Sequence, residues 1–150
     1  MGLMDHNRTW HFELRAAPVE CAAAFGEAMH GKGSFNLRKA EWQLAATQGE
    51  RGFPAVVATY GGRGGVASLL TALYGSRAAA TEAAAKGSQI TFEVTGHEPG
   101  AGRTTCAMWL SLAGKQMAVF TADAGFYRSY MNDVARKLGE LDPGISITKS

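Results

Sequence analysis

The last third of the chain constrains the fold most, because it combines two alternating β segments with one long amphipathic helix. The helix is expected to run from about Ala124 to Leu141, with Asp123 as its N-terminal cap and Pro143-Gly144 just beyond its end. Large apolar residues recur in it at steps of three and four and share one stripe: Phe126, Tyr127, Tyr130, Met131, Val134, Leu138 and Leu141. Such an aromatic stripe requires a sheet or a cavity to face, and the preceding strands supply the sheet.

Length, charge and hydropathy limit the class of protein. At 150 residues the chain fits a single domain over 1–150, with a flexible N-terminus (about 1–8) and a C-terminal tail (about 143–150). The net charge is only +2, and no basic block marks a nucleic-acid-binding or polybasic membrane surface. No apolar run is long enough for a membrane span, and the first residues lack a signal-peptide core. We therefore expect a cytoplasmic monomer or weak homodimer with no nucleic-acid partner and no membrane insertion.

Alternation and helical spacing divide the rest of the chain into short elements. A helix is expected to begin at Pro18 and to end at Gly31, and a second, irregular helical stretch covers 66–86. Alternating or β-rich runs predict strands over Thr9–Ala16, Phe35–Thr47, Ala55–Tyr60, Gln89–Thr95, Thr104–Leu112 and Gln116–Thr121. The elements therefore mix helices with strands that are suited to an antiparallel sheet, which indicates an α+β protein.

Several of these elements together resemble a known family pattern. They are the Trp10/Phe12/Leu14 strand, the Pro18-led helix, the Ile90/Phe92/Val94 strand, the Thr104–Leu112 strand and the Phe126–Leu141 helix. In order and type they resemble the helix-grip fold of the START/polyketide-cyclase-like (SRPBCC) superfamily. The resemblance implies a curved antiparallel sheet wrapped around the long C-terminal helix, with a cavity between them. It carries no diagnostic motif, and the helical segment 66–86 replaces the hairpin expected between the middle strands.

A ferredoxin-like fold is the alternative. Residues 9–97 also follow the order strand, helix, strand, strand, helix, strand, which is that of a split βαβ unit. The remaining strands and the long helix would then form a C-terminal extension.

In a helix-grip fold, aromatic and methionine side chains from several elements would line the cavity. The candidates are Trp42, Tyr60, Tyr74, Trp109, Phe126, Tyr127, Tyr130 and Met131. Their rings and thioethers suit an apolar ligand, and the tyrosine hydroxyls would give it polar contacts. The plainer interpretation is that the same side chains only fill the core.

One glycine-rich run follows a predicted strand and precedes a helical stretch. It consists of Gly61, Gly62, Arg63, Gly64 and Gly65. Its local context is that of a dinucleotide-binding loop, but no acidic residue stands at the end of a following strand at the required spacing, and no GK[ST] follows. We therefore expect a hinge or gating loop and no cofactor.

No cluster of reactive residues stands out. Cys21 and Cys106 are far apart in sequence and in no CxxC pattern, so we expect buried thiols, and their spacing leaves open whether they meet. None of the histidines has zinc-type spacing, and no G-x-S-x-G elbow is present, so we expect no metal and assign no catalytic residue. If the scaffold were enzymatic, Arg128, Glu93 or His97 would provide the acid/base chemistry.

Taken together, the patterns favour a protein that binds a small hydrophobic or aromatic molecule, lipid-like or polyketide-like, between the sheet and the C-terminal helix. A cyclase- or dehydratase-like enzyme on the same scaffold is one alternative. A non-enzymatic interaction or stress-related protein is another, and it would dock through the weakly apolar segment 78–86.

Overall fold

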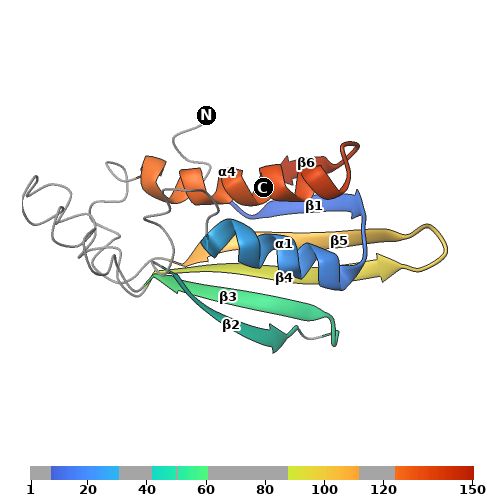
Figure 1. Cartoon of the computed structure of the whole chain (residues 1–150), viewed down its shortest axis with the longest axis horizontal. Helices are drawn as coiled ribbons and strands as arrows, with labels where there is room; N and C mark the ends of the chain where they lie inside the picture. Colours follow the sequence, from blue (N-terminus) through green and yellow to red (C-terminus); the bar gives the residue numbers. More distant parts are fainter. Residues whose placement is uncertain (1–7, 31–41, 50, 61–87, 112–123) are drawn as a thin grey trace, which may run out of the picture.

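The computed structural model describes residues 8–30, 42–49, 51–60, 88–111 and 124–150, which form one antiparallel sheet and two helices (Figure 1). In chain order the elements are β1 (Trp10–Arg15), α1 (Pro18–His30), β2 (Trp42–Gln48), β3 (Pro54–Tyr60), β4 (Gln89–Glu98), β5 (Arg103–Ser111), α4 (Ala124–Leu141) and β6 (Ser146–Lys149). The long helix predicted from Ala124 to Leu141 is confirmed as α4. The predicted elements at 66–86 and 116–121 lie outside the described residues.

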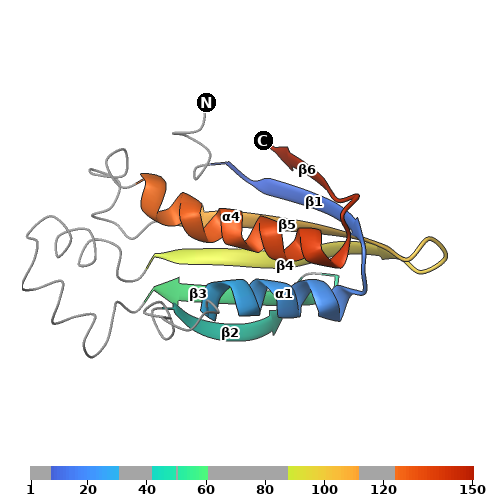
Figure 2. The same cartoon turned by 45° about the horizontal axis from the view of Figure 1, so that its top comes forward.

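The sheet has the strand order β2-β3-β4-β5-β1-β6, and every neighbouring pair is antiparallel. Although β1 is first in sequence, it therefore lies inside the sheet, between β5 and β6. The two helices lie side by side on one face and contact each other (Figure 2). The expected α+β antiparallel sheet is thus confirmed. A sheet wrapped around α4 is not shown, because α4 shares its face of an open sheet with α1.

The ferredoxin-like alternative predicts a different pairing for the strand at 89–97. It makes this strand the last one of a split βαβ unit that contains β1. In the structure, β4 instead pairs with β3 on one side and β5 on the other, so β5 is the strand beside β1. Strand order depends on contacts between distant segments, which local alternation does not specify.

Strand alternation decides which side chains face the helices. In β1, Trp10, Phe12 and Leu14 are buried, whereas the residues between them are exposed. At the centre of this face, Phe25 of α1 stacks on Phe92 of β4 with ring centroids 5.2 Å apart. Burial of one such side chain contributes about 1.5–3 kcal/mol to stability. Of the stripe predicted for α4, Tyr127, Tyr130, Met131, Val134 and Leu138 are buried, whereas Leu141 at its end is 37% exposed.

Residues 146–149 fall in the segment that we expected to be a tail, and they form β6. This strand pairs with β1, beginning with Trp10 opposite Lys149. The Lys149 ammonium also lies 4.0 Å from the centre of the Trp10 ring, which adds a cation–π contact to the backbone ladder. A segment of four residues is too short for its alternation to predict this pairing, which depends on where β1 lies in the sheet.

The turn before β6 is held by the carboxylate of Asp142. It accepts hydrogen bonds from the backbone N–H of Arg15 at 2.8 Å and of Gly144 at 2.9 Å. These two donors, Arg15 first, lower the pKa of the Asp142 carboxyl because they stabilise its charged form. One exposed side chain thus joins the end of β1 to the connection between α4 and β6.

Candidate ligand-binding site

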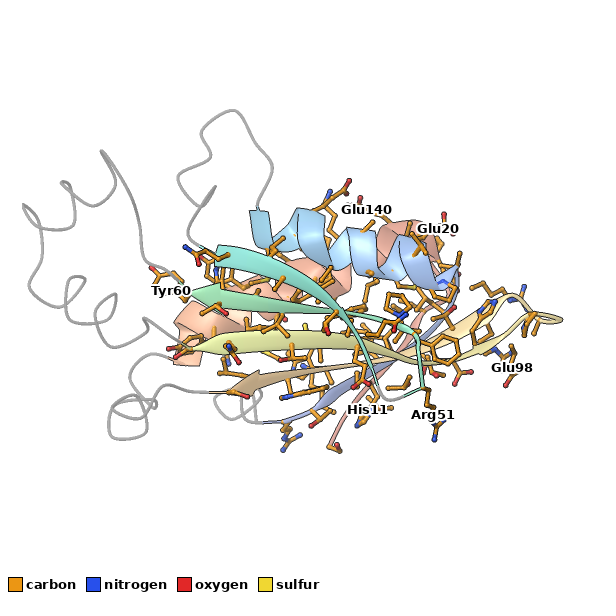
Figure 3. The ribbon with its side chains drawn as sticks, turned by 90° about the horizontal axis from the view of Figure 1, so that it is seen from below. His11, Glu20, Arg51, Tyr60, Glu98 and Glu140 are labelled. Atoms are coloured by element: carbon orange, nitrogen blue, oxygen red, sulfur yellow. The ribbon has the colours of Figure 1, made fainter. Side chains whose placement is uncertain are left out.

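Four of the predicted cavity residues meet at one end of the sheet. Trp42 is the first residue of β2, and the hairpin register places it opposite Tyr60, the last residue of β3 (Figure 3). Tyr127 and Tyr130 lie three residues apart near the start of α4 and therefore share a face of the helix. We call Trp42, Tyr60, Tyr127 and Tyr130 the aromatic cluster. Its members come from the ends of three elements, which all lie at the left in Figure 1.

The Trp42 ring contacts the rings of Tyr60 and Tyr130 edge-on. The Trp42 ring centroid is 5.1 Å from that of Tyr60 and 5.1 Å from that of Tyr130, with interplanar angles of 65° and 71°. Such T-shaped pairs are favoured because the positive edge of one ring meets the negative face of the next. All four side chains of the cluster are at most 2% exposed.

Buried polar atoms are interleaved with these rings. Ser88, just before β4, accepts a hydrogen bond from the Tyr60 N–H through its backbone carbonyl at 2.9 Å, and its hydroxyl accepts one from the Tyr127 hydroxyl at 3.4 Å. The indole N–H of Trp42 is also buried, but no acceptor within the described residues lies in hydrogen-bond range of it. A buried donor without an acceptor costs about 1–3 kcal/mol, so native proteins rarely contain one without a reason. Trp42 therefore offers a donor that a bound molecule could satisfy.

The other predicted cavity residues have different positions. Met131 is fully buried on α4, in the core between helix and sheet. Trp109, which was also predicted to line the cavity, alternates with the inward-facing Met108 and lies on the face of the sheet away from α1 and α4. Tyr74, the side chain of Phe126 and the predicted gating loop of Gly61, Gly62, Arg63, Gly64 and Gly65 lie outside the described residues.

The face of the sheet away from the helices carries a polar hollow of about 370 Å³. Arg51 and Glu93 line it, together with the hydroxyls of Thr95 and Thr105, which are 3.1 Å apart. The hollow lies where the register of β4 and β5 shifts between Val94 and Gly96, a β-bulge that local alternation did not predict. Its lining is charged and hydroxylic, so it does not match the apolar ligand expected from the sequence.

The residues considered for acid/base chemistry lie in three separate places. Glu93 faces the hollow on the outer face, and Arg128 lies near the start of α4. His97 is near the opposite end of the sheet, where its Nδ1 is 3.0 Å from the hydroxyl of Thr104. They do not form one catalytic group. Among the described residues, no three His, Cys, Asp or Glu side chains are grouped so that they could hold a metal ion.

The structure also brings together two residues that sequence spacing could not pair. Cys21 of α1 and Cys106 of β5 are buried free thiols in hydrogen-bond contact. Cys106 alternates with Met108 on the inward face of its strand, which is the signal that it is buried. Which helix residue lies above it depends on how α1 packs on the sheet, and no local pattern contains that information.

Comparisons with known proteins assign no family to the chain. No protein-family model matches it, and no curated protein matches it. The resemblance to the helix-grip superfamily is therefore carried by the order of elements alone. Neither α1 nor α4 is long and apolar enough to cross a membrane.

Proposed function

We propose that the protein binds a small, flat, largely apolar molecule that carries a hydrogen-bond acceptor, at the aromatic cluster where α4 meets β2 and β3. The observation that carries the proposal is the buried Trp42 N–H, which has no acceptor within the described residues. A carbonyl or ether oxygen of the ligand would accept this hydrogen bond. Polyketide-like and other polycyclic aromatic compounds combine such oxygens with flat rings.

The surroundings of Trp42 favour an unsaturated ligand over a simple alkyl chain. Tyr60 and Tyr130 both hold their rings against the indole, and aromatic side chains pair well with flat π-systems. Pockets of this kind gain affinity from apolar contact and orientation from a few polar groups. The Trp42 N–H and the hydroxyl pair of Tyr127 and Ser88 are such groups.

Entry of a ligand beside Trp42 requires at least one ring to move, because the Trp42 ring is in contact with those of Tyr60 and Tyr130. The cluster lies at the ends of β2, β3 and α4, and element ends open locally at lower free energy than the centre of a sheet. The ligand would then select a conformation in which Tyr60 or Tyr130 has turned away from Trp42.

The packing of α4 on this face of the sheet also supports a helix-grip-like arrangement, which we include in the proposal.

Native mass spectrometry of the freshly purified protein, compared with its denatured mass, tests the proposal directly. A surplus mass that is lost on denaturation would identify a bound molecule. In parallel, 1-anilinonaphthalene-8-sulfonate serves as a fluorescent probe of the same site. We expect saturable binding that Trp42→Phe weakens by about tenfold, the equivalent of one hydrogen bond.

Trp109→Phe is the matched control, since it makes the same chemical change on the other face of the sheet. We expect its dissociation constant for the probe to stay within about twofold of the parent value, a difference smaller than one hydrogen bond gives. Equal affinities of the parent and Trp42→Phe would contradict the proposal, as would a parent protein that carries no surplus mass and binds no probe. Circular dichroism confirms that both variants are folded.

A further inference from the structure

Cys21 and Cys106 are the only cysteines in the chain, and the fold places them against each other. Cys21 lies near the start of α1, and Cys106 lies on β5 between Phe12 of β1 and Val94 of β4. Cys21 has 0% and Cys106 2% of its surface exposed, and both are free thiols. Any intramolecular disulfide in this protein can therefore only join α1 to β5.

The contact between the two thiols makes them chemically unequal. Cys106 donates its S–H to the sulfur of Cys21, and this hydrogen bond lowers the pKa of Cys21 by stabilising the thiolate, against burial, which raises it. The same hydrogen bond and burial both raise the pKa of Cys106. Because Cys21 lies near the start of α1 whereas Cys106 lies on an inner strand of the sheet, we assign the attack to Cys21 and the resolving step to Cys106.

We propose that Cys21 and Cys106 form a redox-modification site at which a peroxide converts the two thiols into a reversible disulfide between α1 and β5. The Cys21 thiolate attacks one peroxide oxygen, the O–O bond breaks, and the leaving oxygen takes a proton, which gives a sulfenic acid and water (an alcohol for an alkyl peroxide). The Cys106 sulfur then attacks the sulfenic sulfur. The S–S bond forms, a second water leaves with the thiol proton, and the peroxide has been reduced by two electrons.

Access to the pair comes from the first turn of α1. Val19, two residues before Cys21, is 72% exposed, so the start of this helix is at the surface. Two hydrogen bonds hold the first turn. The Cys21 N–H donates to the Ala17 carbonyl at 3.1 Å, and the Ala17 N–H donates to the Glu20 carboxylate at 2.9 Å. Opening of one helical turn exposes the thiol without disturbing the sheet. The site lies away from the aromatic cluster, so it does not rest on the proposed ligand.

The disulfide and the fold should stabilise each other. A cross-link between α1 and β5 encloses β2, β3 and β4, and it restricts the unfolded chain more than the folded one. By linkage, a fold that holds the two sulfurs together makes the disulfide harder to reduce than it is in the unfolded chain. Mutual stabilisation of this kind distinguishes two thiols that the fold holds in position for a disulfide from two thiols that are neighbours by chance.

The test begins with the reduced full chain, treated with hydrogen peroxide and then alkylated with iodoacetamide under denaturing conditions. We expect the intact mass to fall by two hydrogens with no alkylation, and dithiothreitol to restore both thiols. In glutathione buffers, we expect the disulfide to be at least about tenfold more stable to reduction in native buffer than in concentrated urea. The midpoint of unfolding should be higher for the oxidised than for the reduced protein.

Three results would overturn the proposal. The first is oxidation to sulfinic or sulfonic acid, seen as added oxygen instead of lost hydrogen. The second is a disulfide that is no more stable in the native than in the unfolded chain. The third is an unfolding midpoint that falls on oxidation. None of these measurements requires a variant, and Cys21→Ser serves only as a control that should never lose the two hydrogens.

Discussion

The two ends of the sheet differ in the hydrogen bonding of their buried polar groups. At the turn end, formed by the end of β1, the β4–β5 hairpin and the α4–β6 turn, the buried Thr104 hydroxyl donates to the Ala16 carbonyl at 2.5 Å and accepts from His97 at 3.0 Å. At the aromatic end, the Trp42 N–H is equally buried, but nothing described accepts its hydrogen. Among the described residues, the buried Thr104 hydroxyl at the turn end has two hydrogen-bond partners, whereas the buried Trp42 N–H at the aromatic end has none.

This difference separates stability from binding within one small sheet. Satisfied buried networks fix a local structure, whereas an unsatisfied donor lowers stability unless something occupies it. At the turn end, the Asp142 carboxylate also accepts a hydrogen bond from the Arg15 backbone, and β6 pairs with β1 through backbone hydrogen bonds. The aromatic end depends on ring contacts, which can rearrange without leaving backbone groups unpaired. The binding that we propose therefore lies at the end where a buried donor has no acceptor among the described residues.

The largest expected effect comes from removing the centre of the aromatic cluster. Trp42→Ala should lower the free energy of unfolding by about 3–5 kcal/mol, because it opens a cavity between β2 and α4. Urea unfolding measures the loss, with Trp109→Ala as the control on the outer face. If the two variants lost similar amounts, the aromatic end would not be a packed part of the core.

Two single substitutions sharpen the comparison between the ends. Thr104→Val should cost about 1–3 kcal/mol, because the Ala16 carbonyl and the His97 ring lose their partner. Trp42→Phe removes a donor that has no described acceptor, so the cost of about 1–3 kcal/mol that we expect for the ligand-free protein should come from the smaller ring alone. Both are measured by urea unfolding at neutral pH. A Thr104→Val protein as stable as the parent would contradict our assignment of the two ends.

The smallest effect is expected at Asp142, which is exposed to solvent. Its folded pKa is lowered, so the carboxylate stabilises the fold above its ordinary pKa of about 4, and this contribution is lost as the pH falls through the folded value. Asp142→Ala should therefore have a lower urea midpoint than the parent at neutral pH. The two midpoints should converge in acid, and a difference that persists there would assign the effect to packing instead of charge.

Local patterns in the sequence predicted the parts of the fold that depend on neighbours along the chain. The alternation of Trp10, Phe12 and Leu14 and the stripe of α4 are confirmed because each reflects burial of one face of a single element. The strand order, the β6 pairing and the contact of Cys21 with Cys106 depend on distant segments, and no local pattern contains them. The wrapped sheet was inferred from a resemblance, and the structure supports only its α+β antiparallel character.

The sequence indicated which residues could form the candidate site better than it indicated how they are arranged. Of the eight residues predicted to line a cavity, four lie at one end of the sheet, because the β2–β3 register places Trp42 opposite Tyr60 while helical spacing aligns Tyr127 with Tyr130. Trp109 was included for its ring although its own alternation places it on the other face. The unpaired Trp42 N–H could not be predicted, since hydrogen bonding of a buried group is decided by the whole environment.

The position of β1 between β5 and β6 has a consequence for how the protein is made. During synthesis β1 leaves the ribosome first, but its two neighbours in the sheet are encoded near the end of the described chain. The nascent β1 therefore has exposed backbone groups on both sides until most of the protein has been translated. Folding that waits for such long-range pairing is slow and exposes the chain to aggregation. We expect this protein to depend on chaperones more than a domain whose consecutive strands pair as they emerge.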